Sequence, residues 1–496
     1  MGSFERIRLC AFLRPGSVCV EWPQFHDMKT MKHIKSPKDG HFLFRNAAAG
    51  ITGSALVMFA LASLPSDSYA DEAADEPPKA PTVADSNPLE GTFEAQGSPL
   101  QPKKGARTAG EPEAEEPRPA EWFGGELPWY KWSRVTGNWG GLRDALENGG
   151  ATFAGTYTMD WSAPVSGGIT RRGTARGLLD VNLTVDTEKL GLPGGTLFAQ
   201  YIFRHGRNGS DDVGDLQAFS NIDEVRLSRE YELWFEQKAF GDFVRFKGGQ
   251  VDANSEFAFV NAAGEFINAS GGFSPTIFTF PTYPDPALSL NLFIYPHENV
   301  YIGAGVYGDT ITETSRRGFR EPFYISEVGV TIPGGEKMGD LRIAAGYFYD
   351  TGRLDRFDGG TQGKGTGFYA LVENQLWREN PDDKEDAQGV SVFAQYGYGD
   401  EDVSTFKHHV GLGVSTLGLV PGRDADAMGL YWTTVKTSRA TGSPYDANES
   451  VFEFFYKFEV TPAISLKPDV QWIMNPGGVM TADDALVLTL RLDVTL

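Results

Sequence analysis

One short segment of the chain places an aromatic ring between two carboxylates. In a β-strand, Glu232, Trp234 and Glu236 would share one face because alternate side chains point the same way. Sugar C–H groups stack on aromatic rings, and sugar hydroxyls donate hydrogen bonds to carboxylates. The spacing therefore predicts a surface that can hold a polyhydroxylated molecule.

A second segment, just downstream, supplies the opposite charge. Arg245 and Lys247 alternate with Val244 and Phe246, so both bases would share a face of the next strand. Opposed acids and bases in a water-filled passage would orient water and hydroxyl groups. A lattice of ion pairs that only stiffens the wall fits the same pattern equally well, and both interpretations stay open.

Enzyme chemistry is not indicated by these residues. Glu232 and Glu236 would lie about 13 Å apart along a strand, beyond the about 5–9.5 Å that separates paired carboxylates in glycoside hydrolysis. No nucleophile and base accompany them. The only cysteines, Cys10 and Cys19, lie near the start of the chain, and the seven histidines are scattered. We therefore predict no catalytic residue, no metal site and no cofactor.

Strict alternation is the strongest structural signal in the sequence. Apolar residues occupy every second position of 178–186 and of 486–496, and polar residues occupy most of the positions between them. Similar apolar faces occur in 341–349, 390–398 and 452–458. A period of two with one apolar face is typical of half-buried strands.

These strands are long enough to cross a bilayer when tilted. Several of their apolar faces end in a pair of aromatic residues, as the aromatic girdle at a membrane interface requires. Lipid cannot satisfy an open sheet edge, so such strands must close into a barrel. Sixteen strands of roughly 10 residues leave connections of ordinary porin length, whereas eight would leave implausibly long ones. The predicted fold is an all-β, antiparallel outer-membrane β-barrel of about 16 strands, with 14 or 18 strands or a soluble β-sandwich or propeller as alternatives.

Two segments do not alternate. Residues 142–150 have helical spacing and end in two glycines, which predicts a short helix at the barrel mouth before the first strand. Residues 252–286 are rich in phenylalanine and predict a loop that folds inward and narrows the passage, with an ordinary extracellular loop as the alternative. The candidate residues along the passage are Glu232, Trp234, Glu236, Arg245, Lys247, Asp252, Asn254, Glu256, Asn268, Arg342, Glu453, Lys457 and Arg491.

The first 120 residues have a different composition. Residues 47–62 are uncharged, follow several lysines and precede Ser68-Tyr69-Ala70, which predicts a signal peptide within 1–70 that is cleaved near Ala70. A transmembrane anchor is the alternative. Residues 71–120 are rich in proline, alanine and glutamate and predict a disordered linker. Residues 121–496 would form the barrel.

The acidic balance excludes a nucleic-acid partner. Sixty-six acidic residues oppose 44 basic ones, which gives a formal net charge of −22 and no basic face. In a pore, this balance predicts some preference for cations. The partners that we expect are carbohydrate solutes, outer-membrane lipid and lipopolysaccharide, with the barrel as a monomer or a homo-oligomer.

Several motifs resemble those of the carbohydrate-selective porins, the OprB family. They are TGNWGGLR at 136–143, YELWFEQ at 231–237, GQVDANSEFA at 249–258, PTYP at 281–284, GLVPGRDAD at 418–426 and PDVQWIMNPGG at 468–478. The resemblance covers about 132–496, and the motifs follow one another in the same order as in the family. The chain departs from many outer-membrane barrels in ending with Leu496 rather than an aromatic residue.

The resemblance implies an integral barrel in the outer membrane of a Gram-negative bacterium, usually 16-stranded. It also implies passive or facilitated diffusion of mono- and small oligosaccharides into the periplasm. The alternatives are a non-selective or cation-preferring general porin and a secreted carbohydrate-binding β-protein.

Overall fold

The computed structural model describes residues 7–13, 16–22, 128–308, 318–335, 337–380 and 387–496. The predicted signal core, its cleavage site and the linker at 71–120 lie outside these residues. The chain divides into two units, Met1–Glu72 and Ala73–Leu496. In the first unit, β1 (Ile7–Leu13) and β2 (Gly16–Trp22) form an antiparallel hairpin.

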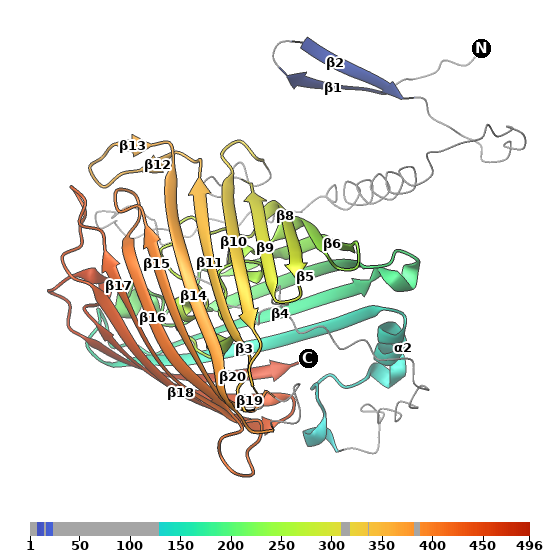
Figure 1. The fold of residues 1–496 in the computed structure, drawn as a ribbon. Coiled ribbons are helices and arrows are strands. Elements are labelled where there is room, and N and C mark those ends of the chain that lie inside the picture. The colour runs from blue at the N-terminus through green and yellow to red at the C-terminus, as the bar shows by residue number, and fades with distance from the viewer. Residues whose placement is uncertain (1–6, 14–15, 23–127, 309–317, 336, 381–386) are drawn as a thin grey trace, which may run out of the picture. The chain divides into compact units, whose positions relative to one another are not determined.

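The second unit is built on a closed barrel of 16 antiparallel strands (Figure 1). This confirms the predicted fold class and strand number. Among the described residues, no helix is long and apolar enough to cross a membrane. The first eight barrel strands are β3 (Ala151–Ser166), β4 (Thr174–Asp186), β5 (Gly195–Gly206), β6 (Leu227–Ala239), β7 (Val244–Val251), β8 (Ala287–His297), β9 (Val300–Tyr307) and β10 (Phe323–Ile332). The other eight are β11 (Leu341–Asp350), β14 (Gly365–Arg378), β15 (Gly389–Gly399), β16 (Phe406–Leu417), β17 (Ala427–Thr437), β18 (Glu449–Thr461), β19 (Ile464–Met474) and β20 (Ala485–Thr495).

The predicted alternation is confirmed on the closing strands. On β20, Leu488 and Leu490 are 43% and 42% exposed, whereas Thr489 and Arg491 are 4% and 6% exposed. Leu490 pairs with Trp161 of β3, which is also exposed, so the first and last strands continue one apolar outer surface. On β20, Thr489 and Arg491 therefore point into the barrel and Leu488 and Leu490 point outward, as a barrel in lipid requires.

The two ends of the barrel carry different connections. At one end, which we call the short-turn end, neighbouring strands are joined by brief turns such as 240–243, 298–299 and 462–463. At the opposite, long-loop end, the segments 207–226 and 252–286 follow β5 and β7. A small two-stranded sheet of β12 (Leu354–Asp355) and β13 (Thr361–Gln362) lies in another connection at this end.

The predicted helix is α2 (Leu142–Asn148), and its C-cap is Gly149. The buried Arg143 of this helix donates to the backbone oxygen of Leu496 at 3.1 Å, and its guanidinium lies 4.3 Å from the ring centre of Trp139. These contacts fix the helix beside the end of β20, so the prediction of a helix at the barrel mouth is confirmed. Other helical turns are α3 (Ser210–Val213), η1 (Trp129–Lys131), η2 (Trp139–Gly141), η3 (Thr187–Leu190), η4 (Ala253–Ser255), η5 (Asn261–Ala263), η6 (Ala269–Gly271) and η7 (Pro476–Gly478).

Strand β6 breaks the expected alternation at a position that matters for the site. The register of β5 and β6 shifts between Ala199 and Tyr201, so Tyr231 and Glu232 both turn inward and both are buried. Strict alternation predicts Tyr231 on the outer face, opposite Glu232 and Trp234, and that placement is wrong. A β-bulge puts two residues of one strand opposite one residue of its neighbour, which reverses the face assigned by simple parity.

Candidate functional site

The segment 252–286 lies inside the barrel. Its backbone is held by side chains of distant strands: the amide of Ala258 donates to Glu327 on β10 at 2.9 Å, and the amide of Ile267 donates to Glu453 on β18 at 2.6 Å. Gln395 on β15 donates to the backbone oxygens of Ser270 and Gly271, each at 3.1 Å. The prediction of an inward-folded loop is therefore confirmed, and we call this segment the constriction loop.

Phenylalanine side chains fill the space between the constriction loop and the wall. Phe257 packs on Phe293 of β8, and Phe266 packs on Phe393, Tyr431 and Phe455. All of these rings are buried. Apolar burial on this scale explains why so aromatic a segment folds inward, since its rings would otherwise face water.

The predicted acids and bases of β6 and β7 pair with each other and with the constriction loop. Arg245 contacts Glu236 at 2.8 Å and Glu256 at 2.6 Å, and Lys247 contacts Glu256 at 2.5 Å. Burial alone would raise the pKa of Glu256, but Arg245 and Lys247 hold that pKa below its usual value. The ion pairs thus anchor the start of the constriction loop.

Trp234 lies inside the barrel, as its parity predicts, but its ring does not face open water. Only 7% of the residue is exposed, and the indole stacks on Phe198 of β5 with ring centres 4.8 Å apart. The ammonium group of Lys247 lies 3.7 Å from the ring centre on the other side. The expectation of a water-facing indole is therefore wrong, because Phe198 of β5 and Lys247 of β7 cover the ring.

Two asparagines predicted to line the passage shape the constriction loop from within. Asn254 donates to the backbone oxygen of Phe257 at 3.2 Å. Asn268 accepts from the backbone amide of Ser270 at 3.0 Å and donates to Gln471 on β19 at 3.1 Å. Both are buried, so their amide groups are taken up in holding the loop's conformation.

Arg342 and Glu453 act as further anchors. Arg342 donates to Glu373 at 2.8 Å, to the hydroxyl of Tyr301 at 3.0 Å and to the backbone oxygen of Phe259 at 3.1 Å. Glu453 accepts from two successive backbone amides of the constriction loop. Both side chains point into the barrel, as predicted, and both end on the loop.

At the tip of the constriction loop, Glu265 bridges two strands. Its carboxylate lies 2.6 Å from the ammonium of Lys457 on β18 and 2.7 Å from that of Lys467 on β19. Burial acts to raise the pKa of Glu265, but Lys467 and Lys457 together lower it to about 2. The loop tip is therefore tied to the wall by charge, and Glu265 was not among the predicted residues.

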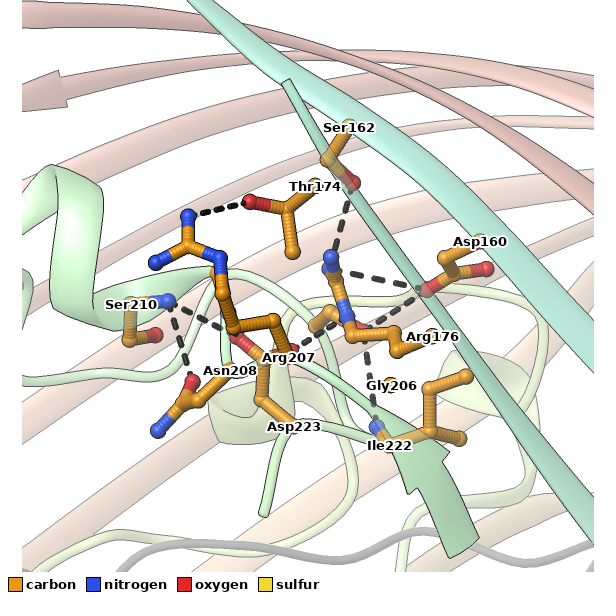
Figure 2. A network of polar contacts seen from close by, with 12 residues as sticks. Asp160, Ser162, Thr174, Arg176, Gly206, Arg207, Asn208, Ser210, Ile222 and Asp223 are labelled. Atoms are coloured by element: carbon orange, nitrogen blue, oxygen red, sulfur yellow. Dashed lines mark hydrogen bonds and ion pairs between the residues drawn. The ribbon is translucent and has the colours of Figure 1, made fainter. Parts of the chain in front are cut away.

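A second inward segment, 207–226, escaped the sequence analysis. Figure 2 shows its Asp223 meeting the guanidinium of Arg176 from β4, which also donates to Ser162 of β3 at 3.1 Å and lies 3.8 Å from Asp160. The predicted Arg491 of β20 reaches the same cluster, donating to Asp160 at 2.8 Å. The inward parity of Asp160 and Arg176 could have been read from their strands, but no local pattern indicated that 207–226 folds inside.

Two cavities inside the barrel adjoin each other. The larger, of about 610 Å³, is lined by residues of β4, β5 and β6, by the constriction loop, and by β15 and β16 across from them. Leu417 and Ala427, which flank the turn 418–426, also line it, so it lies toward the short-turn end. The smaller, of about 220 Å³, shares Gly264 and Glu265 with the larger and is lined by Lys457 and Arg491.

The predicted residues thus divide into two groups. Glu232, Asp252 and Asn254 border the larger cavity, and Lys457 and Arg491 border the smaller. The others are engaged in the contacts between wall and loop described above. Within the part of the chain that the structure describes, no group of three or more histidine, cysteine or acidic residues is placed to hold a metal ion.

Comparison with known proteins places this architecture in a family. A solved structure of OprB from Pseudomonas putida, at high pH, matches with a TM-score of 0.65 and 19% identity, covering 74% of this chain and 98% of that one. The low-pH structure of the same protein matches with a TM-score of 0.51 and 15% identity, covering 74% and 99%.

The sequence comparison agrees with the fold. Porin B of Pseudomonas aeruginosa is 26% identical over 427 residues, which cover 74% of this chain and 91% of that protein. The family model described as carbohydrate-selective porin, OprB family, matches residues 170–496. With its closed 16-stranded barrel and inward loop, the chain belongs to the OprB family of carbohydrate-selective porins.

Proposed function

We propose that this barrel lets mono- and small oligosaccharides diffuse passively across the outer membrane into the periplasm. The observation that carries the proposal is the cavity of about 610 Å³ beneath the constriction loop, which polar side chains border on two sides. Its size lies within the about 300–1,000 Å³ of small-molecule sites. Carboxylates and amides line it on one side and hydroxyl groups of β15 and β16 on the other, which suits a solute rich in hydroxyls.

The orientation in the membrane follows from the two ends. Outer-membrane barrels have short turns on the periplasmic side and longer loops outside the cell. The short-turn end, with α2 and the cavity, would then face the periplasm. Sugars would enter from the long-loop end, pass the constriction loop and leave through the cavity.

Liposome swelling with purified protein tests the transport step. Monosaccharides and disaccharides should enter loaded liposomes faster than a neutral amino acid of similar mass enters them. Equal rates for sugars and for non-sugar solutes of equal size would instead establish a general porin. No swelling with any solute would contradict the proposal.

We further propose that residues 1–70 are removed and that the mature chain begins near Asp71, because a basic region, an apolar core and Ser68-Tyr69-Ala70 follow one another. N-terminal sequencing of protein extracted from outer membranes should find this start. A sequence that begins before residue 47 would show that the segment is retained.

A further inference from the structure

The barrel has one pair of neighbouring strands that no turn or loop joins directly. This pair is β20 with β3, the last and the first strands of the barrel, and we call it the seam. Pairing the two strands closes the longest loop of the barrel, and the entropy cost of closing a loop grows with its length. Every other strand is kept near its neighbour by their own connection. The seam is therefore the place where the closed barrel depends most on additional contacts.

Residues 134–150, which lead into β3, reach across the seam, and we call them the clasp. At one end the clasp is continuous with β3. At the other end, the backbone amide of Val135 donates to the backbone oxygen of Thr495 on β20 at 2.9 Å. The next residue, Leu496, donates from its own amide to the backbone oxygen of Gly155 on β3 at 2.9 Å. The clasp thus lies against the end of β20 while the chain ties it to β3.

Arg143 of the clasp bridges the two strands of the seam. Its Nη2 lies 3.1 Å from the backbone oxygen of Leu496, which follows β20, and 3.5 Å from the backbone oxygen of Phe153 on β3. Its Nη1 donates to the backbone oxygen of Gly137 within the clasp at 2.8 Å. Only 1% of Arg143 is exposed, so water does not compete for these contacts. Hydrogen bonds from a charged donor are stronger than those between neutral groups, which makes this bridge the main attachment of the clasp.

The motif TGNWGGLR at 136–143 has the conformation that the bridge requires. Its glycines have positive φ angles of 62°, 68° and 93°, a region that favours glycine, at Gly137, Gly140 and Gly141. The resulting turn places the ring centre of Trp139 at 4.3 Å from the guanidinium of Arg143 and at 5.3 Å from the ring centre of Phe153. The indole thus holds the guanidinium in place over the seam. Neither Trp139 nor Arg143 borders either of the two cavities, so solute passage does not account for the motif.

We infer that the clasp is a closure device, which is attached to β3 by the chain and to β20 by hydrogen bonds and so keeps the barrel closed at the seam. It acts on the wall of the barrel, whereas the constriction loop acts on the passage. The inference does not depend on which solute the pore admits.

The unfolding rate of the barrel tests the inference. Folded barrels in dodecyl sulfate keep a distinct gel mobility until they unfold, so the loss of this mobility with time at one temperature gives the rate. Arg143→Met removes the bridge and keeps an apolar side chain of similar length. It should unfold about tenfold faster than the parent, a factor that corresponds to about 1.4 kcal/mol. An unfolding rate equal to that of the parent would overturn the inference.

A matched substitution controls for the loss of a cation. Arg378→Met removes a cation from the last residue of β14, which does not belong to the seam. It should unfold at the rate of the parent. Equal acceleration in both variants would show a general effect of lost charge and overturn the inference.

A disulfide across the seam should replace the clasp. Ser162 of β3 and Thr489 of β20 lie directly opposite each other, with hydroxyl oxygens 2.8 Å apart. Changing both to cysteine in the Arg143→Met chain allows a covalent link between the two strands. The native Cys10 and Cys19 are replaced by serine. Oxidation should then slow unfolding to the rate of the oxidised chain that retains Arg143, and the reduced form should still unfold fast.

A second disulfide shows whether the position of the link matters. Thr434 of β17 and Ser450 of β18 also lie directly opposite each other, with hydroxyl oxygens 2.7 Å apart. Cysteines at these two positions link strands away from the seam and should not correct the fast unfolding of Arg143→Met. Equal correction by both disulfides, or by neither, would overturn the inference. If Arg143→Met fails to fold, the yield of folded barrel replaces the rate: recovery with the seam disulfide alone supports the inference, and any other result overturns it.

Discussion

Arg342 is the anchor whose loss should most clearly free the constriction loop. Its guanidinium joins Glu373, Tyr301 and the backbone oxygen of Phe259, all buried. Replacing it with methionine removes the cation and leaves the Glu373 carboxylate buried without it. Breaking one side of a buried ion pair costs about 3–5 kcal/mol. That cost falls on the docked loop rather than on the barrel, whose strands keep their own hydrogen bonds.

Planar-bilayer recording is the suitable assay for Arg342→Met. Loosening the loop by about 3 kcal/mol raises its undocked fraction by more than a hundredfold. We expect higher mean conductance and frequent current fluctuations, with weaker sugar block. The heat-modified mobility of the folded barrel in gels should not change. Arg342→Lys keeps the charge but cannot reach all three partners. Its mean conductance should therefore lie between those of the parent and of Arg342→Met.

A matched control is Arg378→Met, which removes a cation from the last residue of β14 without touching the constriction loop. It should conduct as the parent does. If Arg342→Met had the same mean conductance and the same current fluctuations as this control, the loop would not depend on the anchor and the reasoning would be refuted.

Three other perturbations follow from the same structure. Leu490→Arg puts a charge on the lipid face and should destabilise the barrel by about 2–4 kcal/mol near the midplane, as urea unfolding in lipid vesicles would measure; no change would place Leu490 away from lipid. Trp234→Ala removes the ring that packs on Phe198 and should cost about 3–5 kcal/mol of stability in the same assay; a stable variant that lost only sugar block would contradict this. Because the pKa of Glu265 is lowered to about 2 from its usual 4.5, its ion pairs stabilise the docked loop above pH 4.5 and lose that contribution only as the pH falls toward 2. Glu265→Gln should therefore show more current noise than the parent at pH 7, and this difference should persist at pH 4.5. Equal current noise in the variant and the parent at pH 4.5 would refute the ion-pair account.

The strands could be predicted from sequence because lipid on one side and polar space on the other impose a period of two. Leu488, Leu490 and Arg491 show this directly, since each lies on the face that its parity predicts. The prediction failed at Tyr231, where a β-bulge reverses the parity. A bulge depends on the pairing of two strands, and neither strand shows it alone.

The interior contacts were harder to predict than the wall. Parity correctly placed Arg342, Glu453 and Arg491 inside the barrel, but their partners lie on loops and strands far away in the chain. Period two says which face a residue occupies and does not say what meets it there. The inward fold of 252–286 was predictable from its phenylalanines, whereas 207–226 carries no comparable apolar signal.

The contacts also bear on why charged residues are abundant inside this barrel. Arg245, Lys247 and Arg342 each pair with carboxylates at the junction between wall and loop, so these cations serve mainly to hold the constriction loop. The carboxylates of Glu232 and Asp252 border the cavity instead and lie beyond 4.0 Å of any described cation. Because paired charges largely cancel in their effect on a passing solute, the unbalanced acids set the electrostatic character of the cavity. Selectivity should therefore respond to Glu232 far more than to the more numerous charges around the loop.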